Sequence, residues 1–452
     1  MRKKILESSV LFISISKWIF LASVVGIIVG FSTAFFLTLL GLSTDFAKGY
    51  KYYFILLPAA MFLSVIIVKY LAPEAEGHGT EKVIEAVHKR SGKINPLVVP
   101  VKLLATIITI AFGGSAGKEG PCAQIGAGLS SAMSDLLRFD DNDRRRLVIC
   151  GISAGFATVF GTPIAGAIFG VEVLTVGGLL YDVLLPSFIA GIVGYHVSSY
   201  LGITYFHHPL NFVPVFSSFF FIKVCFGGLF FGLCSVLFIE LLNYLKKISH
   251  KINMSMPYKG ILGGIVLMGL AFLVSARYLG LGLETIETAL EGGKIPWSAS
   301  VMKMLFTSIT LNFGGSGGIV TPIFFIGATA GNIFGRALGL DPSVFAAIGM
   351  VSLLAGAANT PISASIMAVE IFGPSVAPYA AVACVISFLM TGHRSVYPSQ
   401  VLSMSKSSSI AVKKGREMSR IEGVDVTLRE KSITGWIAKG LEKIREKNQK
   451  DN

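Results

Sequence analysis

Charged residues are scarce in this sequence. Lys, Arg, Asp and Glu make up only 14% of the 452 residues, whereas hydrophobic residues make up 53% and the mean hydropathy is +0.70. Such a composition excludes a soluble domain of this length. It predicts a polytopic membrane protein, because an apolar stretch of about 20 residues is long enough to cross a bilayer.

Cysteines are also few and show no pairing pattern. The five cysteines lie at positions 122, 150, 225, 234 and 384, in apolar sequence with no CxxC spacing. This excludes a disulfide framework and a cysteine-based metal site. No cofactor fingerprint, metal motif or nucleophile–base pair is present, so we expect no cofactor and no metal, and an enzyme is the least favoured class. The basic N-terminus lacks the small-residue cleavage site of a signal peptide.

The net charge of +13 comes mainly from the two ends of the chain. Arg2, Lys3 and Lys4 open the sequence, and a basic tail runs from Lys406 to Lys450. Basic residues that flank apolar segments are typical of cytoplasmic ends. We therefore expect a multi-pass protein of the cell membrane with both termini in the cytoplasm. The tail needs no nucleic-acid partner, because anionic membrane lipid attracts such a segment.

Glycine, by contrast, is abundant with 50 residues, and one glycine-rich element occurs twice. Phe112 to Pro121 reads FGGSAGKEGP and Phe313 to Pro322 reads FGGSGGIVTP, an offset of 201 residues. Further matches follow at nearly the same offset: Ile125-Gly126-Ala127 with Ile326-Gly327-Ala328, and Thr162-Pro163-Ile164 with Thr360-Pro361-Ile362, the latter pair followed by Glu172 and Glu370. Repeats with interrupted apolar segments indicate a membrane transport protein whose site lies between the halves.

The repeat divides the chain. The expected units are an N-terminal cytoplasmic segment (1–17), a first transmembrane repeat (18–201), a connecting loop (202–217), a second transmembrane repeat (218–403) and a basic cytoplasmic tail (404–452). The tail is too short for a folded regulatory domain, so we expect a helical or disordered surface segment. Free backbone amides are tolerated at membrane depth only where they line a cavity, which places the glycine motifs inside the protein.

The two glycine motifs predict an anion site. Pro121 and Pro322 lie just inside apparent helix starts, where free amides and the positive end of the helix dipole attract negative charge. A nucleotide-binding loop is excluded, because three residues rather than four separate Gly113 from Gly117, and Glu119 stands where a Ser or Thr is needed. Glu119 has two interpretations: an acid that stabilises the dipole of its own helix, or a carboxylate that competes with an anion for the site.

These residues resemble the CLC family of chloride channels and chloride/proton exchangers, of the prokaryotic type without CBS domains. Gly117-Lys118-Glu119-Gly120-Pro121 matches the family's G(K/R)EGP motif, Gly318-Ile319-Val320-Thr321-Pro322 resembles GxFxP, and Tyr397 in HRSVYPS falls at the family's anion-binding tyrosine. The resemblance covers nearly the whole chain. It implies an all-α polytopic fold, an inverted repeat with broken and tilted helices, no soluble regulatory domain, and a homodimer with one pore per subunit.

The resemblance also implies the residues of the pathway. Glu119 is the gate, Lys102 is a basic residue near the path, and the anion contacts are His78, Gly79, Thr80, Lys118, Glu119, Gly120, Ile319, Val320, Thr321 and Tyr397. His78 replaces the family's serine. Its imidazole either faces the anion, or it points into a vestibule or caps the following helix while the amides of Gly79 and Thr80 bind the ion.

The inner proton acceptor of family exchangers is missing, because their EE pair reads Glu172-Val173 here. An apolar side chain at this position favours passage of chloride, or a related small anion, through a passive channel gated by voltage or pH. A proton-coupled exchanger is the alternative, and a non-transporting membrane enzyme or scaffold is a distant third. For Glu172 and Glu370 we expect a structural role at helix ends.

Overall fold

The structure, a computed structural model, describes residues 2–210, 218–407 and 410–421, and beyond them 427–428, 433, 435–437 and 439–440. Within these residues it contains sixteen α-helices and four strands of two residues each. Five of the helices are long and apolar enough to cross a membrane. The prediction of an all-α polytopic membrane protein is confirmed.

Eight helices come from each half of the chain. The first eight are α1 (Arg2–Lys48), α2 (Leu57–Leu71), α3 (Thr80–Lys89), α4 (Val98–Ala111), α5 (Glu119–Leu136), α6 (Asp141–Phe160), α7 (Pro163–Glu172) and α8 (Tyr181–Tyr200). The other eight are α9 (Ser218–Lys251), α10 (Met256–Leu273), α11 (Leu283–Leu290), α12 (Ala299–Asn312), α13 (Val320–Ala337), α14 (Pro342–Ala358), α15 (Pro361–Phe372) and α16 (Ala377–Met390). Short 3-10 turns are η1 (Tyr53–Leu56), η2 (Pro73–Ala75), η3 (Ala276–Tyr278) and η4 (Met418–Arg420).

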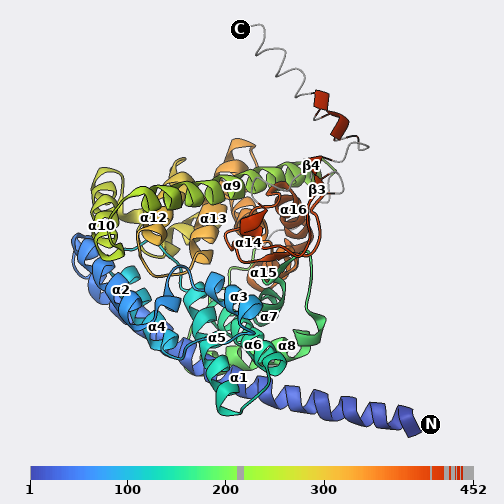
Figure 1. The fold of residues 1–452 in the computed structure, drawn as a ribbon. Coiled ribbons are helices and arrows are strands. Elements are labelled where there is room, and N and C mark those ends of the chain that lie inside the picture. Colours follow the sequence, from blue (N-terminus) through green and yellow to red (C-terminus); the bar gives the residue numbers. More distant parts are fainter. Residues whose placement is uncertain are drawn as a thin grey trace.

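The two sets of helices correspond one to one. The helices α12, α13 and α14 begin 201 residues after α4, α5 and α6, respectively. The helix α15 begins 198 residues after α7. Figure 1 shows the two halves as adjacent layers, the first in blue to green and the second in yellow-green to red. They contact each other through equivalent elements, because α2 packs on α10 and α7 packs on α15. The repeat seen in the glycine motifs thus extends through the fold.

Local sequence signals explain where equivalent helices begin and end. α6 begins after Asp140, whose side chain accepts a hydrogen bond from a first-turn amide at 2.7 Å, and it ends at Gly161 with φ 72°. α14 begins after Asp341, whose carboxylate accepts a first-turn amide at 2.8 Å, and it ends at Asn359 with φ 58°. An acidic residue before the helix and a left-handed residue after it satisfy amides and carbonyls that have no partner inside the helix.

Gly26 and Gly30 allow α1 to pack directly on α8. A Cβ atom at Gly26 would lie 2.7 Å from the carbonyl oxygen of Ala190, and one at Gly30 would lie 2.8 Å from that of Gly194. In lipid the hydrophobic effect does not drive helices together, so close backbone packing at small residues takes its place. This contact fixes α1 along the outside of the first half.

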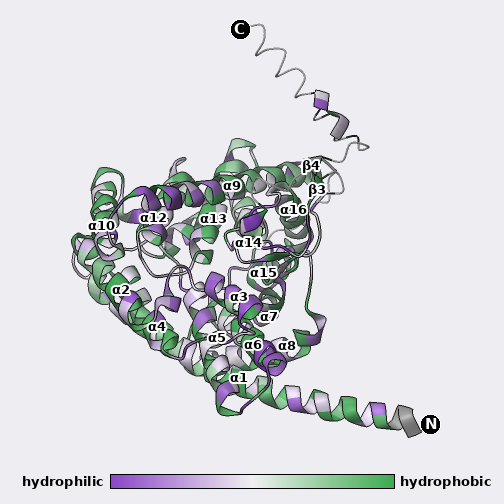
Figure 2. Ribbon diagram, in the orientation of Figure 1, coloured by the Kyte–Doolittle hydropathy of each residue, from purple (hydrophilic) through white to green (hydrophobic). Residues whose placement is uncertain are grey.

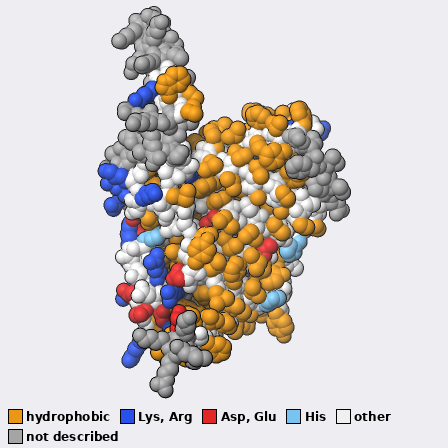
Figure 3. Space-filling view, turned by 90° about the vertical axis from the view of Figure 1, so that its right-hand side faces the viewer, with side chains coloured by type: hydrophobic (Ala, Val, Ile, Leu, Met, Phe, Trp, Pro, Cys, Tyr) orange, Lys and Arg blue, Asp and Glu red, His pale blue; other side chains and the backbone are white. Residues whose placement is uncertain are grey.

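The outer surface carries large apolar side chains. On α1 alone, Phe12, Phe20, Phe31 and Phe35 are each more than half exposed. Figure 2 shows that the outer helices are mainly hydrophobic, and Figure 3 shows a face covered by hydrophobic side chains with the charged ones gathered along one edge. Patches of this size mark contact with another apolar phase, which for a multi-pass protein is lipid.

The first part of the tail packs on the two halves, unlike the surface segment that the sequence predicts. At the end of the second repeat, β2 (Val401–Leu402) pairs in parallel with β1 (Thr175–Val176) of the first repeat. Within the tail, β3 (Ile410–Ala411) pairs with β4 (Thr427–Leu428). Met418 and Ile421 are buried in a cluster with Leu402. These apolar side chains hold the segment against the protein by their burial. The sequence prediction missed them because charged residues predominate in the tail. Most of residues 422–452, and residues 211–217 of the expected connecting loop, lie outside the described residues.

Candidate anion pathway

The two glycine motifs meet at the centre of the protein. The amide of Gly117 donates to the carbonyl of Gly318 at 2.7 Å, and the amide of Gly318 donates to the carbonyl of Gly117 at 2.6 Å, which forms an antiparallel bridge. A Cβ atom at Gly318 would lie 2.8 Å from the amide nitrogen of Gly120, so the approach requires glycine. The repeat therefore brings the two predicted helix starts together.

Hydroxyl groups hold the motifs in this arrangement, and they do so reciprocally. The Ser115 amide donates to the Thr310 hydroxyl at 3.0 Å, and the Ser316 amide donates to the Thr109 hydroxyl at 3.1 Å. Thr109 and Thr310 lie 201 residues apart, as Ser115 and Ser316 do. Each half thus provides the hydroxyl that satisfies a buried amide of the other.

Glu119 is the first residue of α5, and its carboxyl binds the start of α13 from the other half. It is fully buried. Its Oε2 accepts the Thr321 amide at 3.1 Å, and its Oε1 accepts the Thr321 hydroxyl. These are the donors that a bound anion would use at a helix start. The geometry therefore supports the second interpretation of Glu119, a carboxylate that competes with an anion.

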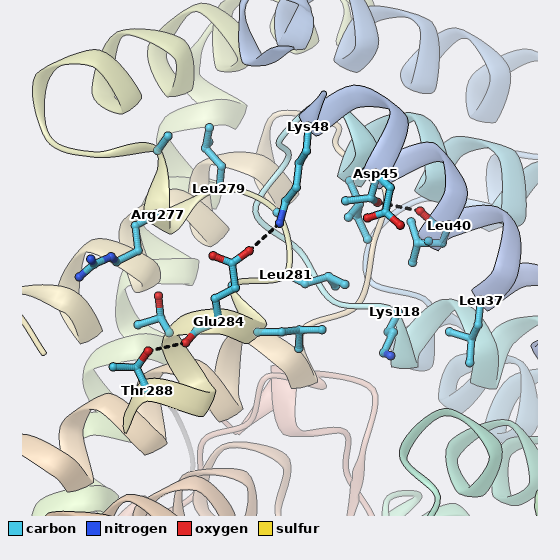
Figure 4. A pocket seen from close by; sticks show the side chains of 18 of the residues that line it. Leu37, Leu40, Asp45, Lys48, Lys118, Arg277, Leu279, Leu281, Glu284 and Thr288 are labelled. Atoms are coloured by element: carbon cyan, nitrogen blue, oxygen red, sulfur yellow. Dashed lines mark hydrogen bonds and ion pairs between the residues drawn. The ribbon is translucent and has the colours of Figure 1, made fainter. Parts of the chain in front are cut away.

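The other predicted contacts of the helix starts lie around this carboxyl. Gly120, Ile319 and Val320 are buried, with exposures of at most 1% for the latter two. Lys118 lies one residue before Glu119 and lines a cavity of about 790 Å³ together with Lys48, Arg277 and other residues. Figure 4 shows this cavity, with Lys118 apart from the ion pair that Lys48 forms with Glu284 at 2.9 Å. The cavity thus leads to the backbone beside the buried carboxyl.

The segment from His78 to Thr80 approaches the same backbone from α3. A Cβ atom at Gly79 would lie 2.5 Å from the carbonyl oxygen of Gly120, so the two chains are in direct backbone contact. Thr80, the first residue of α3, is buried. A smaller cavity of about 180 Å³ is lined by Gly77 and by Ser316 of the second motif. Gly77 and Gly280, which lines the larger cavity, occupy similar positions in the two halves.

His78 and Tyr397 come together although 319 residues separate them. Their ring centroids lie 5.6 Å apart at an interplanar angle of 50°. Tyr397 is fully buried. Within the described part of the chain, neither its hydroxyl nor Nδ1 of His78 makes a well-aligned hydrogen bond, although Thr80 lies close to the hydroxyl. Buried polar atoms are rarely left unpaired, so these two atoms point to a ligand or to water.

Lys102 is fully buried, and its ammonium holds the segment before His78. It donates to the carbonyls of Ala75 at 3.1 Å and Gly77 at 2.5 Å. Lys303, at the offset of 201, does the same in the second half, donating to Tyr278 at 3.1 Å and Gly280 at 2.7 Å. The sequence reading missed Lys303, but the repeat offset applied to Lys102 would have identified it.

Glu172 and Glu370 cap helices of the opposite half. The carboxyl oxygens of Glu172 accept the amides of Ile362 and Ser363 at 3.0 and 2.8 Å. Those of Glu370 accept the amides of Ile164 and Ala165 at 2.9 and 2.8 Å. Both acids therefore have the structural role at helix ends that we expected. Val173 is buried behind them, and its carbonyl accepts the Gln400 side-chain amide at 2.7 Å.

Helix starts from two repeats that meet at a buried carboxyl are typical of a membrane protein that transports anions. The family described as voltage gated chloride channel (CLC) matches residues 60–392. The chain belongs to this family. The predicted family and fold are confirmed.

Individual relatives extend the comparison. The chain is 36% identical over 400 residues to a chloride/fluoride channel protein of Pseudomonas syringae pv. tomato, covering 87% of this chain and 88% of the relative. It is 30% identical over 393 residues to an uncharacterized protein of Methanocaldococcus jannaschii, covering 85% and 96%. A CLC-type fluoride/proton antiporter has a similar structure, with a TM-score of 0.82, 27% identity and coverage of 86% and 98%. A slow cyanobacterial Cl⁻/H⁺ antiporter shares the fold, with a TM-score of 0.73, 21% identity and coverage of 83% and 94%.

These findings establish the coarse function. The chain is a multi-pass membrane protein of a family that transports anions. Its characterized relatives are channels and antiporters rather than enzymes.

Proposed function

We propose that this protein exchanges small halide ions, fluoride and chloride, for protons, and that Glu119 is its gate. The observation that carries the proposal is the Glu119 carboxyl on the amide and hydroxyl of Thr321, at the start of a helix from the other half. The names of two relatives support the choice of ions and of exchange: a chloride/fluoride channel protein, and a fluoride/proton antiporter of closely similar structure.

In this proposal the carboxyl has two states, of which the structure contains the one bound to Thr321. An ionised carboxylate binds the amide at the α13 start and excludes a halide, because both are anions that need the same donors. A protonated carboxyl has no charge to offer the helix dipole, so a halide can displace it from Thr321. Each cycle of protonation and deprotonation of the Glu119 carboxyl therefore couples the movement of one proton to that of one anion.

The remaining predicted contacts complete the path. Lys118 and the cavity of about 790 Å³ supply anions on one side of Glu119. On the other side, the Tyr397 hydroxyl and His78 offer hydrogen bonds, together with the amides of Gly79 and Thr80. Lys102 adds a positive charge beside this segment. Hydrogen-bond donors and partial charges hold the ion without binding it too tightly to leave.

Two features of the proposal follow from the family resemblance and the charge pattern. The protein forms a homodimer with one pathway per subunit. Both basic termini lie in the cytoplasm, because positive residues beside membrane segments are retained there.

The competing reading is the passive chloride channel that Val173 favours. The test uses purified protein in liposomes with opposing halide and proton gradients. An exchanger takes up protons against their gradient when halide flows, and Glu119→Gln abolishes this uptake while halide still moves. Glu284→Gln is the control for the loss of one acid. Glu284 lines the same cavity as Lys118 and pairs with Lys48, so this variant changes the charge of the cavity while the Glu119 carboxyl stays in place, and it should keep proton uptake. Halide flux without any uphill proton movement would make the protein a channel.

A further inference from the structure

Glu81 is an acid of the protein interior that the sequence reading did not single out. It is the second residue of α3, directly after Thr80. Its Oε1 accepts two hydrogen bonds from Ser399, from the amide at 3.0 Å and from the hydroxyl at 2.5 Å. Its Oε2 is buried and has no hydrogen-bond partner in the described part of the chain. One oxygen is therefore held in place while the other is available to a proton.

We propose that Glu81 is the inner proton-exchange group of this protein. In family exchangers an acid at the position of Val173 has this role, and valine cannot carry a proton. The inference rests on the proposed proton coupling and adds the group that takes protons from the side opposite Glu119's cavity.

Comparison with the other interior acids favours Glu81. The two oxygens of Glu172 are both bound by amides of α15, and those of Glu370 are both bound by amides of α7. Those of Glu119 are both bound by Thr321. Of these four acids, only Glu81 has an oxygen without a hydrogen-bond partner among the described residues.

Glu81 is connected to the anion pathway through Tyr397. Ser399, which holds its Oε1, lies two residues after Tyr397 in the same loop. The Tyr397 hydroxyl lies within electrostatic range of both Glu81 and Glu119. That hydroxyl and Nδ1 of His78 are the unpaired polar atoms described above. Buried water binds to such atoms, so the proposed proton route from Glu81 to Glu119 passes through water bound to these two groups.

Glu81 is also connected to solvent, through its own helix. Glu85 lies four residues further along α3, so the two side chains share a helix face. The Glu85 side chain is 30% exposed and pairs with Lys82 at 3.3 Å and Lys89 at 3.4 Å. The charged and titratable groups that face Glu81 are Glu85, Tyr397 and, from α9, Lys246. Glu85 at the surface of α3 and Glu81 at its buried start thus form a pair of acids on one helix face.

The proton transfer balances without any further reactant. A hydronium ion in the water near Glu85 breaks one O–H bond and gives the proton to Oε2 of Glu81, which leaves a water molecule and a neutral carboxyl. The new O–H bond at Oε2 then breaks, and the proton passes through water beside Tyr397 to the Glu119 carboxylate. Glu81 regains its negative charge, and the neutral Glu119 carboxyl releases Thr321 to a halide.

The test compares the number of protons moved per halide in liposomes. Glu81→Gln keeps an oxygen that can accept both Ser399 hydrogen bonds but cannot carry a proton. We expect the proton-to-halide ratio to fall at least tenfold, while Glu81→Asp, which keeps an acid, retains measurable coupling. Ser399→Ala is the control, since it removes the hydroxyl contact to Oε1, which Glu81→Gln retains, and leaves the acid in place. It should keep the wild-type ratio.

Each outcome decides between the proposals. An unchanged ratio in Glu81→Gln would overturn the role of Glu81 while leaving proton exchange intact. A loss in Ser399→Ala as large as that in Glu81→Gln would show that the Glu81–Ser399 contact sets the ratio without any proton on the acid, and would overturn the role of Glu81. A wild type that moves no protons would overturn the proposed function itself, and the inference with it. If Glu81→Gln does not fold, the double variant Glu81→Ala with Ser399→Ala, which leaves no unpaired hydroxyl, should show the same tenfold loss.

Discussion

At the scale of single residues, the pathway depends on donors that have no permanent protein acceptor. The Thr321 amide and hydroxyl bind the Glu119 carboxyl in this structure, and the same two groups would bind a halide once the carboxyl moves away. The Tyr397 hydroxyl is unpaired within the described residues. Leaving a buried hydroxyl unpaired is costly for stability, which makes sense if an anion or water occupies the position during transport.

Tyr397→Phe tests this view of the hydroxyl. The substitution removes one hydrogen bond to a charged partner, which is worth roughly 1.5–3 kcal/mol. Halide binding measured by calorimetry should weaken by about tenfold to a hundredfold. Thermal stability without halide should change little, because the hydroxyl lies close to Thr80 but makes no well-aligned hydrogen bond among the described residues. Unchanged halide affinity, or a large loss of stability, would assign the hydroxyl a structural role instead.

The sequence identified some of these residues and missed others for physical reasons. Glu119 could be found because a carboxylate beside glycines at a helix start is chemically unusual. Lys303 was overlooked because a lone lysine in an apolar segment shows its role only when the repeat is extended to it. Glu81 was overlooked because an acid in the first turn of a helix is common, and only the structure shows that one oxygen is buried without a partner.

At the scale of elements, equivalent helices from the two halves depend on each other. α7 ends at Glu172, which caps the start of α15, and α15 contains Glu370, which caps the start of α7. Each cap places a carboxylate at the positive end of a helix dipole. This reciprocal capping resembles the reciprocal backbone hydrogen bonds between Gly117 and Gly318 at the centre of the protein. It ties the halves together at a second place.

Loss of either cap should destabilise the fold. Glu172→Gln and Glu370→Gln each remove the charge and one acceptor oxygen, and we expect each to cost about 1–2 kcal/mol. Thermal unfolding in detergent would measure both, with the exposed Glu284→Gln as a control that should leave stability nearly unchanged. Should the cap variants keep wild-type stability but alter the transport rate, these acids would belong to the transport pathway.

At the scale of the whole molecule, the two halves repeat the same arrangement of helices but differ at the position of the carboxyl that binds α13. The 201-residue offset predicted the pairing of α5 with α13, since the two helices begin at equivalent positions after similar glycine motifs. Glu119 has Val320 as its counterpart at that offset, so only one half contributes a carboxyl. The offset could not predict that the tail would pack on the halves, because the burial of Met418 and Ile421 depends on a surface formed by distant segments.

The central claim is that the Glu119 carboxylate and a halide compete for the start of α13. Calorimetric binding of fluoride and chloride to purified protein between about pH 4 and 7 tests it most directly. Lowering the pH protonates the carboxyl, so wild-type affinity should rise by up to about tenfold per pH unit in the range where the carboxyl titrates. Glu119→Gln, which cannot be ionised, should bind halide tightly with no dependence on pH, and Glu284→Gln should keep the wild-type slope. The same pH slope in Glu119→Gln as in the wild type would contradict the account.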